Sequence, residues 1–404
     1  KDDMVFPGKL NAIKDKKLDK LDVKTEADAK KITTDLKDAS YQVADVTKKE
    51  VNKAPPTPFT TSTLQITAHN MLGFSAKQTM TLAQKLYETG RITYMRTDSM
   101  TLSEKFLAEA QSYIQSSFGD AYAKGARRYK TKKKGAQEAH EAVRPTDPSA
   151  HPDALKISDS GMAKLYRLIW SRTLATQMPP ARLERTAVDI VAQDYIFRAN
   201  GSTVVFDGFL KVYKGGADKL LPELEKGNAV ANKTLEANQH FTEPPARYSD
   251  ATLVKVLEEH DIGRPSTYAP TIQTIITREY VDRDDNKKLY PLDTAFIVND
   301  VLTEHFPNIV DYAFTAKLEQ ELDDIAEGEQ EWIPTLREFY DPFHKLIEEK
   351  DKTLKKEDLV KERVLGQDPK SGKDVIVKIG RFGPFVQIGD YTEQDKKDKK
   401  PKPK

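Results

Sequence analysis

The sequence predicts a multidomain protein with α-helices and antiparallel β-sheet, in which a helical domain is inserted between two halves of a sheet domain. Three observations support this fold class. The 404 residues exceed what a single hydrophobic core usually organises. Period-two alternation and helical spacing of apolar residues occupy separate stretches of the chain. Proline-rich runs at 54–58 and 244–245 exclude helix and mark boundaries between units.

The composition indicates an open or elongated molecule with a large surface. Charged residues make up 31% of the chain and hydrophobic residues 38%, yet the apolar periodicity argues against disorder. The absence of cysteine excludes disulfides and thiolate metal sites, and seven scattered histidines predict no metal site within the chain. No apolar run approaches the ~20 residues that cross a bilayer, so no membrane partner is expected.

An antiparallel sheet is expected on either side of a helical stretch. Tyr41–Val46 alternates as a strand with one buried face. Four further strands are expected at 186–191, 195–198, 203–206 and 209–213. We therefore expect a discontinuous sheet domain over 1–56 and 156–240, interrupted by a mainly helical domain over 57–155.

Helical spacing dominates the interrupting stretch. Ser75 and Thr101 each begin a capping-box pattern, which predicts helix starts at these two residues. Tyr87 belongs to the apolar stripe of the first helix, and Gly90 is placed to end it. Another helix is expected over 158–178, before a pair of prolines.

The stretch 241–355 predicts a winged-helix-like base domain. A helix over 249–260 is followed by a tight turn at Gly263 and a second helix capped by Ser266, as in a helix-turn-helix. Residues 280–290 then read as a β-hairpin, which would be the wing. A plain helical hairpin beside a β-ribbon is the alternative.

Two segments follow this base domain. Short strands with glycine turns predict a small β module over 356–392. Residues 393–404 form a lysine-rich tail that we expect to be flexible.

Tyr94 carries the first candidate chemistry. It lies on a connection between two predicted helices, two residues from Arg96. A tyrosine hydroxyl attacks poorly unless a cation stabilises the developing charge, and the planar guanidinium of arginine matches phosphate oxygens. These are the parts of a phenolic nucleophile with a phosphate-polarising arginine. From the residues alone, a half-buried tyrosine hydrogen-bonded in a loop is the favoured interpretation.

Two further clusters are typical of anion binding. Between 121 and 144 eight basic residues outnumber two acidic ones, and the stretch ends in His140-Glu-Ala-Val-Arg144. Arg264, Ser266 and Thr267 lie at a predicted helix start, where backbone N–H groups bind phosphate. The alternatives are a solvated loop beside a structural histidine and ordinary helix capping. No phosphate-binding glycine loop occurs, so nothing predicts nucleotide hydrolysis.

At these clusters the chain resembles the bacterial type IA DNA topoisomerases over nearly all of its length. The similar strings lie at 86–99, around Tyr94, at 138–146, around His140, and at 241–249 and 263–268. The resemblance implies a clamp: a β-sheet arch, a hinged helical domain with the active-site tyrosine, a winged-helix-like base and one C-terminal topoisomerase repeat. It implies that Tyr94 is the nucleophile, Arg96 the phosphate-polarising cation and His140 a supporting catalytic residue.

The resemblance also implies a set of DNA-contacting residues. Eight lie in the quoted strings and two are aromatic residues of the C-terminal repeat, for which a structural role is the equal alternative: Thr97, Asp98, Ser99, Arg144, Arg247, Arg264, Ser266, Thr267, Phe382 and Phe385.

The implied activity is ATP-independent relaxation of negatively supercoiled DNA through a 5′-phosphotyrosyl intermediate, strand passage and religation. The family carries an N-terminal Toprim domain with a catalytic glutamate, a lysine and a Mg²⁺ site, which these 404 residues do not contain. We therefore expect this chain to bind single-stranded DNA, with no metal or cofactor of its own, and to be catalytically incomplete. The resemblance implies a monomer in the bacterial cytoplasm, at the nucleoid.

Two other functions remain open at this stage. One is a topoisomerase III-like enzyme that separates linked DNA circles, against which the C-terminal repeat argues mildly. The other is a non-enzymatic clamp that binds single-stranded DNA.

Overall fold

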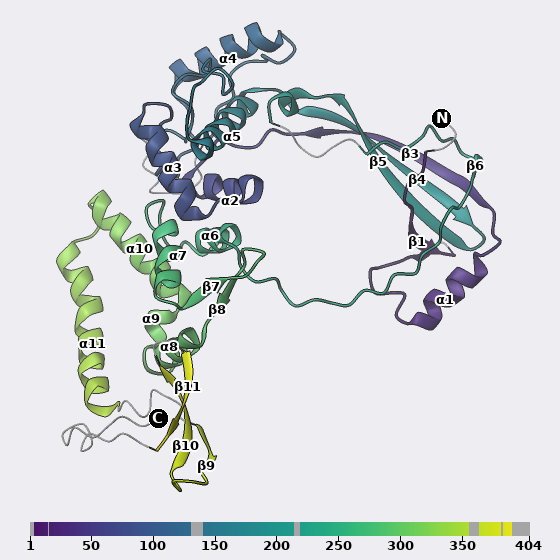
Figure 1. Ribbon diagram of the computed structural model, residues 1–404. Helices are drawn as coiled ribbons and strands as arrows, with labels where there is room; N and C mark the ends of the chain where they lie inside the picture. Colours follow the sequence, from purple (N-terminus) through teal and green to yellow (C-terminus); the bar gives the residue numbers. More distant parts are fainter. Residues whose placement is uncertain are drawn as a thin grey trace.

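A computed structural model of the chain describes residues 4–14, 16–130, 140–213, 219–354, 363–380 and 383–389. The described elements form four groups: a six-stranded sheet, a helical group, a base of helices with a β-hairpin, and a small three-stranded sheet (Figure 1). The mixed α and β class with antiparallel sheets is confirmed. Among the described residues no helix is both long and apolar enough to span a membrane.

The six-stranded sheet is antiparallel and has the order β2-β1-β5-β4-β3-β6. Its strands are β1 (Lys9–Ile13), β2 (Lys16–Lys17), β3 (Tyr41–Lys53), β4 (Ala181–Ala192), β5 (Tyr195–Phe206) and β6 (Ala229–Val230). Helix α1 (Glu26–Asp35) connects β2 to β3. On β4 the alternating residues Val188, Ile190 and Ala192 are buried, as the sequence pattern predicts for a strand with one buried face.

The strand expected at 209–213 is wrong. The chain forms a short 3₁₀ helix there, η1 (Gly208–Lys211). Gly208 has φ 48°, which breaks the extended backbone directly after β5. The ring of Phe209 then enters the core of the helical group instead of a sheet face.

The helical group contains α2 (Thr61–Leu72), α3 (Ala76–Glu88), α4 (Glu104–Phe118) and α5 (Ser160–Gln177). Its buried core joins all four helices, with Leu64, Leu86, Phe106 and Ile169 among the fully buried side chains. Helix α5 therefore packs with the helical group, whereas the division expected at residue 155 assigns it to the sheet. Its buried, largely apolar flank is part of the core of that group.

One of the two helix starts expected in this group differs from the structure. Ser75 caps α3 by accepting the N–H of Gln78, as predicted. Helix α4, however, begins after Ser103 and not after Thr101, without a side-chain cap. The Ser103 N–H is instead bound by Glu141, so a residue distant in sequence replaces the local cap.

The base comprises eight elements: α6 (Asp250–Glu259), α7 (Tyr268–Thr277), β7 (Val281–Arg283), β8 (Leu289–Pro291), α8 (Asp293–His305), α9 (Pro307–Val310), α10 (Tyr312–Glu327) and α11 (Trp332–Thr353). Ser249 caps α6 with a reciprocal capping box. The predicted cap of α7 at Ser266 is wrong, because Thr267 occupies that position. The predicted hairpin is present as β7 and β8.

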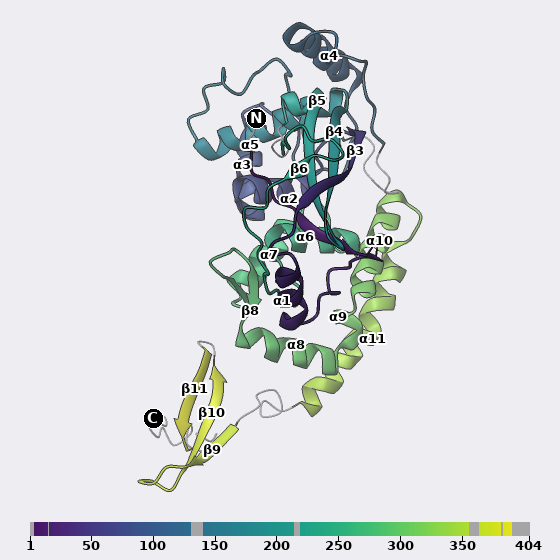
Figure 2. The ribbon, with the colours of Figure 1, turned by 90° about the vertical axis from the view of Figure 1, so that its right-hand side faces the viewer.

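The small sheet has the order β11-β10-β9 and lies at the end of the molecule farthest from α4 (Figures 1 and 2). Its strands are β9 (Arg363–Gln367), β10 (Asp374–Gly380) and β11 (Gly383–Ile388). The lysine-rich tail expected at 393–404 lies outside the described residues.

The chain path forms a ring. On one side α2 packs against α6 and α3 against α7, which brings the helical group onto the base (Figure 1). On the other side an exposed segment without helix or strand, residues 231–248, runs from β6 to α6. The ring is therefore closed on one side by the covalent chain, through residues 231–248, and on the other by the non-covalent contact between the helical group and the base.

Candidate active site

Tyr94 lies on an irregular segment between α3 and α4 and is presented to solvent. Helix α3 ends at Glu88, and Gly90, with φ 68°, turns the chain away from the helix axis. Beyond it, Met95 and Thr97 are buried, while Tyr94 is 40% exposed and Arg96 is exposed. This alternation is that of an extended segment, so the Tyr94 and Arg96 side chains lie on the same outer side.

The first turn of α2 and the segment after His140 hold this loop from within. The Thr61 hydroxyl donates to the Met95 carbonyl oxygen at 2.7 Å, and the Thr97 N–H donates to the Thr61 hydroxyl oxygen at 2.8 Å. The Thr93 hydroxyl donates to the Ala142 carbonyl oxygen at 2.6 Å. These anchors join segments that are distant in sequence, and the sequence analysis did not identify Thr61 or Thr93.

The Tyr94 ring is packed between two other rings. Its centroid lies 5.2 Å from that of Tyr87 and 6.5 Å from that of His140, both edge-on. Tyr87 is 41% exposed, so its expected place in the apolar stripe of α3 is wrong. The helix turns this ring toward the loop, where it limits the orientations of the nucleophile candidate. The structure thus brings Tyr94 and His140 together, as the resemblance implies.

Arg96 offers a positive charge without an internal partner. Within the described part of the chain, no hydrogen bond or ion pair engages its guanidinium group. An unpaired, exposed guanidinium beside Tyr94 has its five N–H donors available for an anion.

Three residues next to Arg96 are less available than expected. Thr97 and Ser99 are buried, and their hydroxyl oxygens accept the N–H groups of Ser99 and Thr101 at 3.0 and 3.1 Å. Both side chains therefore shape the loop and are not presented to DNA. Asp98 is half-buried and close to α7: burial raises the pKa of Tyr268, and the charge of Asp98 contributes to the rise.

Arg144 is also used internally, contrary to its expected role as a DNA contact. Its side chain is 11% exposed, and its Nε donates to Glu141 Oε2 at 2.5 Å. The guanidinium carbon lies 4.2 Å from the centroid of the Phe106 ring, and Nη1 donates to the Pro145 carbonyl oxygen at 2.9 Å. Burial raises the pKa of Glu141, but the bonds from Arg144 and Ser103 outweigh it, so this pKa is below its ordinary value.

The third predicted cluster is partly neutralised by α10. Arg264 Nη2 donates to Asp323 Oδ2 at 2.6 Å, and Nη1 lies 3.7 Å from Glu319 Oε2. Thr267 accepts the Arg264 N–H at 2.8 Å, and Ser266 is exposed. Arg264 is thus held by two carboxylates and not free as expected for a strand-binding residue.

The remaining expected DNA contacts lie far along the chain from Tyr94. Arg247 is exposed on the segment 231–248. Phe385 is 45% exposed on β11, and Phe382 lies outside the described residues.

The described residues do not assemble a metal site. No group of three or more His, Cys, Asp or Glu side chains among them has the geometry to hold a metal ion.

The chain is similar to known proteins over most of its length. A sequence model of the DNA topoisomerase family matches residues 4–337, and one of the topoisomerase C-terminal repeat matches residues 368–401. DNA topoisomerase 1 of Xylella fastidiosa (strain Temecula1 / ATCC 700964) is 44% identical over 416 residues, which cover 97% of this chain and 51% of that protein. DNA topoisomerase 1 of Campylobacter jejuni is 45% identical over 401 residues, covering 95% and 57%.

A solved structure is similar as well. Full-length topoisomerase I from Thermotoga maritima superposes with a TM-score of 0.76 at 31% identity, covering 95% of this chain and 63% of that chain. The chain spans about half the length of the curated relatives it matches.

Proposed function

The chain belongs to the bacterial type IA DNA topoisomerase family, and from this premise we propose that Tyr94 transiently cleaves one strand of DNA. The observation that carries the proposal is the exposed Tyr94, with the unpaired Arg96 on the same side of the loop and the His140 ring centroid 6.5 Å from that of Tyr94. A nucleophile, an anion-binding fork and an imidazole at one exposed loop are the parts that attack on a phosphodiester requires.

The proposed cleavage of the strand by Tyr94 is a transesterification that needs no co-reactant. The Tyr94 phenolic oxygen bonds to phosphorus while the bond from phosphorus to the 3′-oxygen breaks. The phenol loses its proton and the released 3′-hydroxyl gains one, so no net charge is produced. Arg96 binds the phosphate oxygens, whose charge increases as the bond forms, and His140 supports the same phosphate.

The 5′-phosphotyrosyl link preserves the energy of the cleaved bond. After another strand has passed through the break, the 3′-hydroxyl attacks phosphorus and releases Tyr94, so no nucleotide hydrolysis is needed. Repetition of this cycle would relax negatively supercoiled DNA, whose underwound regions provide the single strand.

Two other parts of the chain are assigned to DNA binding. Helices α6 and α7 with the hairpin β7–β8 follow the element order of a winged helix, and we propose that this face of the base holds the single strand. The β9–β11 sheet falls largely within the topoisomerase C-terminal repeat match, and its exposed Phe385 offers a ring on which a base stacks.

The family is compatible with Mg²⁺ dependence, but the residues described here do not fit a Mg²⁺ site. The acidic side chains near Tyr94 are committed elsewhere: Glu141 binds Arg144, and Asp98 is half-buried toward α7.

Because the proposed substrate is DNA, we propose that the protein acts in the bacterial cytoplasm, at the nucleoid. We also propose that it acts as a monomer. The alternatives, a topoisomerase III-like enzyme and a binding clamp without chemistry, make different predictions. A clamp would not attach covalently to DNA, and a topoisomerase III-like enzyme would separate linked circles in preference to relaxing supercoils.

The nucleophile is tested by Tyr94→Phe in this chain, supplied with the Toprim domain that the family carries. Removal of one hydroxyl should abolish covalent attachment to a labelled single-stranded oligonucleotide and leave non-covalent binding nearly unchanged. Attachment is measured by denaturing gel and binding by fluorescence anisotropy.

Tyr87→Phe is the matched control, because it removes a hydroxyl from the neighbouring ring. It should retain covalent attachment. Attachment by Tyr94→Phe at the level of the unmodified protein would refute the assignment.

A further inference from the structure

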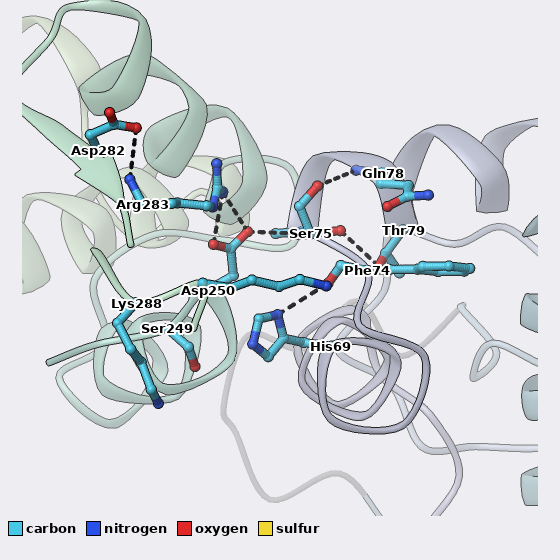
Figure 3. A network of polar contacts seen from close by, with 12 residues as sticks. His69, Phe74, Ser75, Gln78, Thr79, Ser249, Asp250, Asp282, Arg283 and Lys288 are labelled. Carbon is cyan, nitrogen blue, oxygen red and sulfur yellow. Dashed lines mark hydrogen bonds and ion pairs between the residues drawn. The ribbon is translucent and has the colours of Figure 1, made fainter. Parts of the chain in front are cut away.

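A single buried carboxylate lies where the helical group meets the base. Asp250 is the first residue of α6 and is 2% exposed. Its Oδ2 accepts the backbone N–H of Ala76, the first residue of α3, at 2.9 Å (Figure 3). Helix N-termini carry partial positive charge, so this carboxylate is stabilised by two helices at once. One of them belongs to the base and the other to the helical group.

The charge of Asp250 is balanced from the base alone. Arg283 of β7 donates through Nη2 to both carboxylate oxygens, at 2.8 and 3.0 Å (Figure 3). The neighbouring strand β8 is fixed to the start of α6, because Leu289 donates its N–H to the Tyr248 carbonyl oxygen at 2.7 Å. The Asp250–Arg283 pair therefore stays together if the groups separate, and the bond to Ala76 is the one that breaks.

Apolar and peripheral polar contacts surround this bond. Ala76 is buried together with Val254, Tyr268 and Ile272 of the base. At the rim, the Lys287 ammonium donates to the carbonyl oxygen of Gly73 at 2.9 Å. The contact is thus a small apolar patch that includes the buried charge-assisted hydrogen bond from Ala76 to Asp250.

The same helices hold the Tyr94 loop. In the first turn of α2, Thr61 binds the Met95 carbonyl oxygen, whereas the next residue, Ser62, donates to Glu258 Oε1 of α6 at 2.7 Å. Two adjacent residues of α2 therefore form hydrogen bonds to different parts: Thr61 to the Tyr94 loop and Ser62 to the base. The position of Tyr94 relative to the base depends on whether α2 and α3 are docked.

From these contacts we propose that Asp250 is a positioning residue, whose carboxylate holds α3, and with it the Tyr94 loop, docked on the DNA-binding base. Loss of this contact releases the helical group while both groups stay folded. The meaning of this release for strand passage rests on the proposed function, but the docking equilibrium itself exists without DNA.

Docking is measured by single-molecule fluorescence transfer on the 404-residue chain. The chain contains no cysteine, so dyes attach only at introduced residues, Ala108→Cys on α4 and Asn299→Cys on α8, both exposed. Asp250→Asn keeps the shape but removes the charge. It should raise the ratio of undocked to docked molecules by about tenfold to a hundredfold, the range for losing a charge-assisted hydrogen bond.

Two comparisons make the outcome decisive. Asp285→Asn removes the same charge from the exposed hairpin turn and should leave the ratio unchanged. Ala76→Pro replaces the N–H donor by a ring carbon in the buried contact, at a first-helical-turn position that accepts proline, and should undock the group at least as strongly as Asp250→Asn does. This second variant leaves the Asp250–Arg283 pair intact, so it remains informative if Asp250→Asn impairs folding.

Equal ratios in Asp250→Asn, Ala76→Pro and the parent, with unchanged circular dichroism, would overturn the proposal. So would an undocked state that appears only together with loss of helical signal, because Asp250 would then be merely structural. Covalent attachment by Tyr94→Phe would refute the proposed function but would not alter this result.

Discussion

Arg96 differs from Arg144 and Arg264 in having no internal partner among the described residues. Arg144 and Arg264 are both bound to carboxylates of the chain. We therefore expect the chemistry to depend on Arg96 far more than on these two. Arg96→Lys retains the charge but loses the planar fork, so covalent attachment should slow by a factor on the order of 10–1,000.

Oligonucleotide affinity of Arg96→Lys should change little, because we expect many other basic residues to share the phosphate contacts. Single-turnover attachment and equilibrium binding are measured in parallel, with exposed Arg337→Lys on α11 as the control. A loss of affinity as large as the loss of rate would make Arg96 a binding residue.

Glu141 gives a pH-dependent prediction. Its folded-state pKa lies below the ordinary value of 4.5, so it stabilises the fold above that pH, and this contribution is lost as the pH falls through the folded-state pKa. Glu141→Gln should lower the free energy of unfolding by about 1–3 kcal/mol near neutral pH, because Arg144 loses its charged partner.

The difference between Glu141→Gln and the parent should shrink in acid. Urea unfolding of both proteins at pH 7 and at the lowest pH that preserves the fold measures it. The exposed Glu329→Gln should show no such difference at either pH. A deficit in Glu141→Gln that is the same at both values would contradict the ion-pair explanation.

For single residues, the sequence predicts which side chains have suitable chemistry better than it predicts which of them are free to contact DNA. The spacing of Tyr94 and Arg96 predicts that both face the same side, and their alternating exposure agrees. Nothing near Arg144 in sequence shows that the Phe106 ring will cover its guanidinium. Tertiary contacts decide which charged side chains are paired within the protein. The sequence alone therefore predicts too many DNA contacts.

At the element scale, helix starts were predictable where the cap is local. Ser75 and Ser249 bind N–H groups within their own first turns. The helix start predicted at Thr101 is wrong, because the helix begins after Ser103, whose N–H donates to Glu141, a residue distant in sequence. The strand expected at 209–213 fails because Phe209 packs into a core built by other elements.

Gly208 provides a prediction about the junction of β5 with the helical group. A Cβ added there would lie 2.6 Å from the carbonyl oxygens of Pro179 and Pro180, in addition to the strain of φ 48°. Gly208→Ala should therefore destabilise the protein by more than the ~1 kcal/mol expected from backbone conformation alone.

Gly328→Ala isolates the backbone effect. Gly328 also has positive φ, 79°, but nothing lies within 4 Å of an added Cβ. Thermal unfolding of the two variants should show the larger loss for Gly208→Ala. Equal losses of stability in the two variants would mean that the backbone around Gly208 moves to accommodate the added Cβ at no cost in free energy.

At the scale of the whole molecule, binding should be governed by phosphate contacts. We expect the 404-residue chain to bind a single-stranded oligonucleotide with an affinity that falls steeply with salt. With about five phosphate contacts, the association constant should drop about a hundredfold between 50 and 200 mM salt.

The salt dependence is measured by fluorescence anisotropy titration. An oligonucleotide with an uncharged backbone serves as the control and should show almost no slope. A flat response with ordinary DNA would indicate binding through base stacking alone.

The pairing of Lys53 with Ala181 at the ends of β3 and β4 has a consequence for the autonomy of the parts. Both ends of the helical group meet at this one rung of the ladder. Residues 54–180 could therefore be excised and replaced by a tight turn, leaving β3 and β4 as an ordinary hairpin. The excised piece would carry α2 to α5 with most of their shared core, losing chiefly Ala181 and Phe209 from it. We therefore expect the segment that carries Tyr94 and the sheet to unfold as separate thermodynamic units.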